Sequence, residues 1–131
     1  MKVAIGSTLS EVFSAFQLTM AFDPICAKVN NKVEGMHFRV YHNKDVEFLD
    51  MHSASASRNY TRTLFFVLCK AVHDCYPKSY VVIDIPVSNG YFVNVDLGRP
   101  LEATDITRIR ERMQAIIDAR MPVRRFEVTT E

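Results

Sequence analysis

Cys69 and His73 are residues whose types and spacing could do chemistry in this 131-residue chain. Their C-x-x-x-H spacing places a thiol and an imidazole one turn apart on a predicted helix. Such a pair could hold a zinc ion, or act as nucleophile and base. A metal site needs a third ligand, and the candidates are the histidines of predicted loops, His37, His42 and His52. The pattern favours a half-buried cysteine beside a solvent-facing histidine, with no metal or catalytic site, and leaves a metal- or cysteine-dependent hydrolase as an alternative.

A second group of candidates surrounds the start of the same predicted helix. Arg58, Tyr60 and Arg62 cluster there, after a segment rich in serine hydroxyls. Helix N-termini attract anions through free N–H groups and the helix dipole, and an arginine offers paired donors to a phosphate. Phe66 adds an aromatic surface on which a base could stack. The pattern favours solvated residues, and leaves Arg58, Tyr60, Arg62 and Phe66 as candidates for binding a nucleotide or RNA.

Arginines also alternate along a later predicted helix. Residues two apart on a helix diverge by about 200°, so these side chains do not form one basic face. Neighbouring acidic residues balance their charge. A solvated helix face is therefore predicted, rather than nucleic-acid contact, for Arg108, Arg110 and Arg112, with Arg124 and Arg125 further along the chain.

The composition excludes several classes of function. The chain has 16 basic and 15 acidic residues, a net charge of +1, which gives no signal for a polyanion partner such as DNA. No apolar run approaches the ~20 residues of a membrane span, and the N-terminus lacks the apolar segment of a secretory signal. The cysteines are odd in number and lack C-x-x-C spacing, which indicates free thiols. A cytoplasmic protein without a membrane partner is predicted.

The first half of the chain has the pattern of a small α/β unit. Thr8 and Glu11 form a capping box that predicts a helix over about 8–18. The pair Asn30-Asn31 tolerates the positive φ of a tight turn, which predicts a hairpin of strands 27–29 and 32–34. Alternation of apolar and charged residues predicts a further strand over 46–48.

The second half begins with a predicted helix over about 60–75, ended by Tyr76-Pro77. At 100° per residue its apolar stripe opposes a face made of Arg62, Phe66, Cys69 and His73. The composition of HSASASR, residues 52–58, predicts a loop at the boundary between the two halves. The stripe itself consists of Leu64, Leu68, Ala71, Val72 and Cys75.

The remaining segments predict a hairpin, a helix and a strand. Residues 80–85 and 91–97 read as paired strands around the turn Ser88-Asn89-Gly90. Thr104 and Asp105 open a helix that Met121-Pro122 stops, and residues 123–129 are predicted to form a closing strand. The residues of this helix expected to face a core are Ile106, Ile109, Met113, Ile116 and Ile117.

Two long segments together resemble the N-terminal part of threonyl-tRNA synthetases. GSTLSEVFSAF and AKVNNKVEGMHFRVYHNKDVEFLD resemble a TGS domain, a β-grasp module. KAVHDCYP, NGYFVNVDLGRPL, ITRIRERMQAII and MPVRRFEVT resemble, in order, the editing-type domain of the same family. That family carries two histidines four apart, where this chain has Arg62 and Phe66. The resemblance implies a retained fold, a degenerate editing site, and a structural role for the turn at Arg99-Pro100.

The same pair of modules precedes the kinase domain of long bacterial nucleoside kinases of the uridine kinase and phosphoribulokinase type. AKVNNKVEG, NKDVEFLD, LFFVLCKAVHDCYP and GRPLEATDITRIRERMQAIIDA resemble that group more closely. The resemblance implies a parent transferase that uses ATP and magnesium on uridine or a related nucleoside. The chain itself lacks a G-x-x-x-x-G-K-[ST] phosphate loop and implies no cofactor of its own, so an N-terminal fragment of a longer protein is expected.

These observations predict an α+β protein with two modules. A TGS-like β-grasp module over 1–51 is expected to pack on an editing-like module, of the second additional domain type, over 52–131. The leading hypothesis is a non-catalytic accessory module that binds a nucleotide or RNA and accompanies a kinase domain in the parent chain. The first alternative is the N-terminal region of a threonyl-tRNA synthetase-like protein that has lost editing activity.

Overall fold

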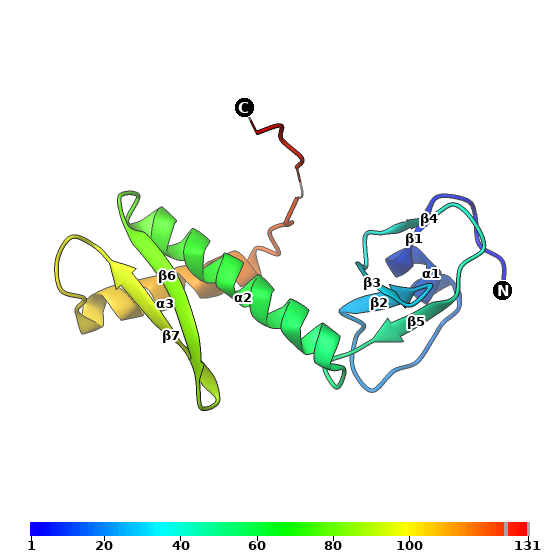
Figure 1. Cartoon of the computed structure of the whole chain (residues 1–131), viewed down its shortest axis with the longest axis horizontal. Helices are drawn as coiled ribbons and strands as arrows, with labels where there is room; N and C mark the ends of the chain where they lie inside the picture. The colour runs from blue at the N-terminus through cyan, green and yellow to red at the C-terminus, as the bar shows by residue number, and fades with distance from the viewer. Residues whose placement is uncertain (125, 131) are drawn as a thin grey trace. The chain divides into compact units, whose positions relative to one another are not determined.

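A computed structural model describes residues 1–124 and 126–130 of the chain, which divides into two compact units, Met1–Thr63 and Leu64–Glu131 (Figure 1). The predicted α+β class is confirmed, because helices and antiparallel strands occur in both units. The division between the units falls within helix α2, Ala54–Cys75.

Helix α2 begins about six residues before the predicted start, so the loop expected over 52–58 is wrong from residue 54 onward. The backbone N–H of Ser57 donates to the carbonyl of Ser53 at 2.9 Å, which closes the first turn. Ala56 is fully buried in a cluster with Cys26 and Leu49. Burial of this one small side chain favours helix in a segment whose serines would otherwise suit a loop.

Unit 1 contains a short helix, α1 Leu9–Ala15, and a three-stranded antiparallel sheet in the order β3 (Lys32–Gly35), β2 (Cys26–Val29) and β5 (Val46–Leu49). The capping box is confirmed: Thr8 Oγ1 accepts from the Glu11 N–H at 3.2 Å, and Glu11 Oε2 accepts from the Thr8 N–H at 2.8 Å. The helix ends earlier than predicted, and Gln17 beyond it adopts φ +48°. The elements are β1 Ser7–Thr8, α1 Leu9–Ala15, β2 Cys26–Val29, β3 Lys32–Gly35, β4 Arg39–Val40 and β5 Val46–Leu49.

The predicted hairpin of β2 and β3 is confirmed, with Val29 opposite Lys32. Asn30 and Asn31 adopt φ values of +46° and +68°, the left-handed conformation that the turn requires. The Asn30 side chain also accepts a hydrogen bond from the Asp45 N–H at 2.9 Å, which ties the turn to the segment before β5. One core cluster of this unit buries Leu9 of α1 with Ala27 and Val29 of β2.

Unit 2 consists of the C-terminal part of α2, a two-stranded ribbon and a helix. The ribbon strands are β6, Tyr80–Val87, and β7, Gly90–Asp96, and the helix is α3, Ala103–Asp118 (Figure 1). The predicted hairpin is confirmed, with Tyr80 opposite Asp96. Between the pairs Ile83–Val93 and Pro86–Tyr91, β6 has one residue more than β7, so the bulge lies in β6.

The core of unit 2 forms where α2 meets α3. Ala71 and Val72 are buried with Ile109 and Ile116, and Val81 and Val95 of the ribbon pack against this cluster. The prediction that Ile106 and Ile117 face the core is wrong, because these residues are 55% and 46% exposed. At 100° per residue they lie about 60–100° around the helix from the buried isoleucines, outside the stripe that α2 and the ribbon cover.

The closing strand predicted over residues 123–129 is wrong for 123, 124 and 126–129, which belong to no strand. Arg125 lies outside the described residues. Within residues 1–124 and 126–130, we find no helix with the length and apolar character needed to cross a membrane.

Candidate functional site

The exposed face of α2 carries most of the candidate residues. Arg58, Arg62 and Phe66 follow one another at intervals of four, so they lie on successive turns of one side of the helix. Phe66 is 67% exposed, which is high for a phenylalanine. Cys69 and His73 continue the exposed face. The solvent-facing position of His73 is confirmed, whereas the half-buried position expected for Cys69 is wrong.

The early start of α2 changes the chemistry expected of Arg58 and Arg62. Ala54 begins the helix, so Arg62 lies about two turns inside it, away from the free N–H groups of its N-terminus. The expected helix-terminus contribution to anion binding at Arg62 is therefore wrong. Any anion that binds there would depend on the guanidinium groups themselves.

The two arginines have few internal partners. Arg58 Nη2 donates to Ser55 Oγ at 3.4 Å, a long hydrogen bond. In the part of the chain that the structure describes, neither Arg58 nor Arg62 forms an ion pair. Tyr60 is two residues from each, so it lies on a different side of the helix. The helix therefore presents two available guanidinium groups and one exposed benzene ring on one face.

Cys69 and His73 lie one turn apart and are both exposed. No group of three or more His, Cys, Asp or Glu side chains that could hold a metal ion occurs among the described residues. His52, one of the candidate third ligands, has its Nδ1 3.2 Å from Asp50 Oδ1 and its ring 5.2 Å from that of Phe22. These contacts give the histidine a local structural role within unit 1.

A polar cluster that the sequence did not predict is centred on the buried Asp105. Its carboxylate accepts two hydrogen bonds from Arg99, at 2.7 and 2.8 Å, and one from the Tyr76 hydroxyl at 2.6 Å. The backbone N–H of Glu102 donates to it at 3.0 Å. Arg99 is thus paired with a buried carboxylate while 47% of its own side chain stays exposed, in agreement with the structural role that the DLGRP turn implied.

These contacts shift the pKa of both ionic partners. Hydrogen bonds from Arg99, Tyr76 and the Glu102 N–H hold the pKa of the Asp105 carboxyl well below its usual range. The carboxylate in turn raises the pKa of the Arg99 guanidinium. The sequence signals for this cluster were the Arg99-Pro100 turn and the acidic residue in the first turn of α3, and neither predicts that Arg99, Tyr76 and Asp105 meet.

Two arginines of α3 also contact other residues of unit 2. Arg112 donates through Nε and Nη2 to one carboxylate oxygen of Asp74, at 2.9 and 2.6 Å. The guanidinium carbon of Arg108 lies 5.9 Å from the centre of the Tyr76 ring. Arg108 and Arg110 are exposed, as a solvated helix face predicts, whereas Arg112 is half-buried and ion-paired.

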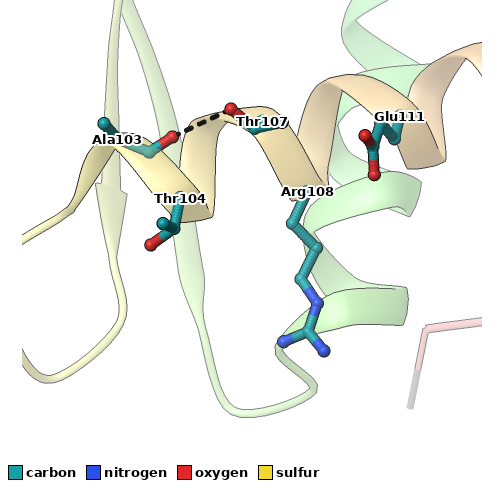
Figure 2. A pocket seen from close by; sticks show the side chains of 5 residues that line it. All are labelled: Ala103, Thr104, Thr107, Arg108 and Glu111. Atoms are coloured by element: carbon teal, nitrogen blue, oxygen red, sulfur yellow. Dashed lines mark hydrogen bonds between the residues drawn. The ribbon is translucent and has the colours of Figure 1, made fainter.

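A surface depression of about 390 Å³ lies along α3 (Figure 2). Its hydroxyl-bearing residue Thr107 is occupied internally, since Oγ1 donates to the Ala103 carbonyl at 3.1 Å. Arg108 and Glu111 place opposite charges along it. The depression is open and has no buried polar group directed into it, so it indicates no particular ligand. It is lined by Ala103, Thr104, Thr107, Arg108 and Glu111.

Comparison with known proteins relates the chain to one kind of enzyme. Threonine–tRNA ligase of Desulforamulus reducens is 26% identical over 128 residues, which is 98% of this chain and 20% of the ligase. The ligase of Rubrobacter xylanophilus is 25% identical over 131 residues, 100% of this chain and 20% of the ligase. The chain is similar along its length to threonine–tRNA ligases. It spans about a fifth of the length of these curated relatives, and no family model matches it.

The similarity to threonine–tRNA ligases favours one of the two resemblances drawn from the sequence. It supports the synthetase-like region that was the first alternative. The nucleoside-kinase parent, with its kinase domain, ATP and magnesium, has no support from these relatives.

Proposed function

We propose that this chain is a non-catalytic, threonyl-tRNA synthetase-like region with a degenerate editing site, and that the exposed face of α2 binds RNA. The observation that carries the proposal is the pair Arg62 and Phe66. They stand where the synthetase resemblance places two histidines, and both are exposed one turn apart on α2. A guanidinium and a benzene ring do not activate a metal-bound water, but they suit a phosphate and a base.

The arginines and the exposed aromatic ring of this face support RNA as the ligand. Arg58 and Arg62 lack ion-pair partners among the described residues, so their charge is available to a phosphate. Aromatic side chains on such a surface stack single-stranded bases with little dependence on sequence. The relatives are named as ligases of tRNA, which makes tRNA of the threonine type the first RNA to test.

The first experiment measures hydrolysis of mischarged threonine-type tRNA by the 131-residue chain, with and without added zinc. No hydrolysis above the uncatalysed rate is expected, because the histidine pair is absent. A zinc-dependent hydrolysis would show that an editing reaction survives. The Cys69→Ala variant then tests whether the thiol carries it, as the hydrolase alternative requires.

The second experiment titrates the same tRNA by fluorescence anisotropy at several salt concentrations. Arg62→Ala is expected to weaken binding and to reduce the salt slope by about one, because one phosphate contact is lost. Arg110→Ala is the matched control, since Arg110 is exposed on α3. Equal effects of the two variants would exclude a specific role for Arg62.

Phe66 is tested by substitution with alanine. Loss of a stacked base is expected to cost about 1–3 kcal/mol of binding free energy, with little change in the salt slope. Tyr80→Ala is the control, because Tyr80 is 75% exposed and lies on β6. If the chain binds no tRNA at all, the proposed RNA-binding role is wrong, and the proposed loss of editing activity is unaffected.

A further inference from the structure

The two edges of the β6–β7 ribbon differ in their capacity to accept another strand. In the described residues, β6 and β7 pair only with each other. Proteins block free strand edges with bulges, prolines and charged side chains. Strand β6 has both a bulge and Pro86, whose nitrogen has no hydrogen to donate. Strand β7 is regular and carries no charge from Gly90 to Val95, so its second edge is open as far as residues 1–124 and 126–130 show.

One face of the same ribbon is apolar and exposed. Val81 and Val95, which are cross-strand partners, pack against the core of unit 2. Side chains alternate between the two faces of a strand, so the neighbouring positions point to the other side. There, Tyr80 is 75% exposed, Val82 50% and Phe92 58%. A two-stranded ribbon with one bare apolar face is a marginal sheet that another strand would extend.

The charge of the ribbon decides against RNA as the occupant. Between Tyr80 and Asp96 it carries two carboxylates, Asp84 and Asp96, and no basic side chain. Phosphate groups would be repelled by this surface. A polypeptide strand, whose backbone N–H and C=O groups complete the ladder of β7, fits better.

We propose that the open edge of β7 pairs antiparallel with β7 of a second copy of this chain. With Val93 on the twofold axis, Tyr91 lies opposite Val95 of the second copy, so apolar side chains meet on the core side. Phe92 then lies opposite Asn94 on the exposed face. At each end of the paired strands, Gly90 of one copy lies opposite Asp96 of the other, so no two like charges lie opposite each other. The result is a four-stranded sheet in the order β6-β7-β7-β6, with a closed, isologous interface.

The test compares two lysine substitutions at cross-strand partners, Asn94→Lys on β7 and Val82→Lys on β6. Both add one positive charge to the exposed face, but only position 94 lies on the proposed interface strand. Sedimentation equilibrium of the 131-residue chain is measured over about a hundredfold range of concentration, because a dimer dissociates on dilution. The expected result is a species of twice the 15.0 kDa chain mass for the original protein and Val82→Lys, and a monomer for Asn94→Lys.

Hydrogen exchange of the unsubstituted chain keeps the test independent of whether a variant folds. Protection of amides in β7 should increase with protein concentration, while that of amides in β6 stays constant. A chain that sediments as a monomer at every concentration would overturn the proposal. So would a dimer that Asn94→Lys leaves intact, or one whose concentration-dependent protection lies outside β7.

Discussion

Arg99 donates one guanidinium N–H to each carboxylate oxygen of Asp105, at 2.7 and 2.8 Å. This paired geometry connects the segment after β7 to the first turn of α3. The Tyr76 hydroxyl adds the end of α2 to the same carboxylate. One side chain therefore joins three segments of unit 2, and the side chain of Asp105 is only 5% exposed.

Replacing Asp105 by asparagine should destabilise unit 2 in a pH-dependent way. The pKa of this carboxyl is lowered by Arg99, Tyr76 and the Glu102 N–H. Its stabilisation is therefore complete above its ordinary pKa of 3.8 and is lost as the pH falls from there toward the lowered value. Urea unfolding should show a large difference between Asp105→Asn and the original chain at about pH 7, and a smaller one at about pH 3. The exposed Asp84→Asn is the control, and a difference that does not shrink in acid would contradict this account.

Replacing Thr8 by alanine should destabilise unit 1 by about 1 kcal/mol, the usual contribution of an N-cap. The substitution removes the hydroxyl that accepts from the Glu11 N–H. Thermal unfolding followed by circular dichroism measures the change. Ser10→Ala, two residues further on and exposed, should change the stability little; equal effects would show that the cap contributes nothing.

Position 31 tests the left-handed turn between β2 and β3. Asn31 has φ +68°, which a β-branched side chain adopts only with strain. Asn31→Val should therefore lower the free energy of unfolding by about 1–2 kcal/mol. Asn31→Gly should leave it unchanged or raise it slightly, since glycine adopts this conformation freely. The urea midpoints of the two variants give the comparison, and the reverse order would contradict a left-handed turn.

Two isoleucines of α3 test the core of unit 2 with the same substitution. Ile109 is 6% exposed and Ile106 is 55% exposed. Ile109→Ala should cost about 2–5 kcal/mol, because it removes buried methyl groups and leaves a cavity. Ile106→Ala should cost within about 0.5 kcal/mol, as at an ordinary surface position. A large cost at Ile106 in denaturant unfolding would indicate that something covers this side of the helix in solution.

Local signals in the sequence predicted most elements of the fold. The Thr8–Glu11 box and the Asn30-Asn31 turn depend on residues close in the chain, so their geometry follows from residue type. The start of α2 did not follow in this way. Its serines favour a loop by themselves, and the burial of Ala56 with Cys26 and Leu49 depends on residues distant in sequence.

The candidate site shows the same limit. Helical spacing correctly separated Arg62, Phe66, Cys69 and His73 from the apolar stripe, although Cys69 is exposed and not half-buried as expected. It could not predict that Asp105 collects hydrogen bonds from Arg99 and Tyr76, because Tyr76 lies 29 positions away in the chain. Nor could it separate Ile106 and Ile117 from the buried isoleucines, since the width of the covered stripe is set by the elements that pack on it.

The three thiols give each compact unit its own reporter of opening. Cys26 is fully buried in unit 1, and burial raises the pKa of its thiol; Cys75 is half-buried in unit 2, and Cys69 is exposed. An alkylating reagent should label Cys69 at once, and Cys26 only as fast as unit 1 opens. Mass spectrometry of the labelled peptides during mild denaturation would then show whether the two units unfold together or one before the other.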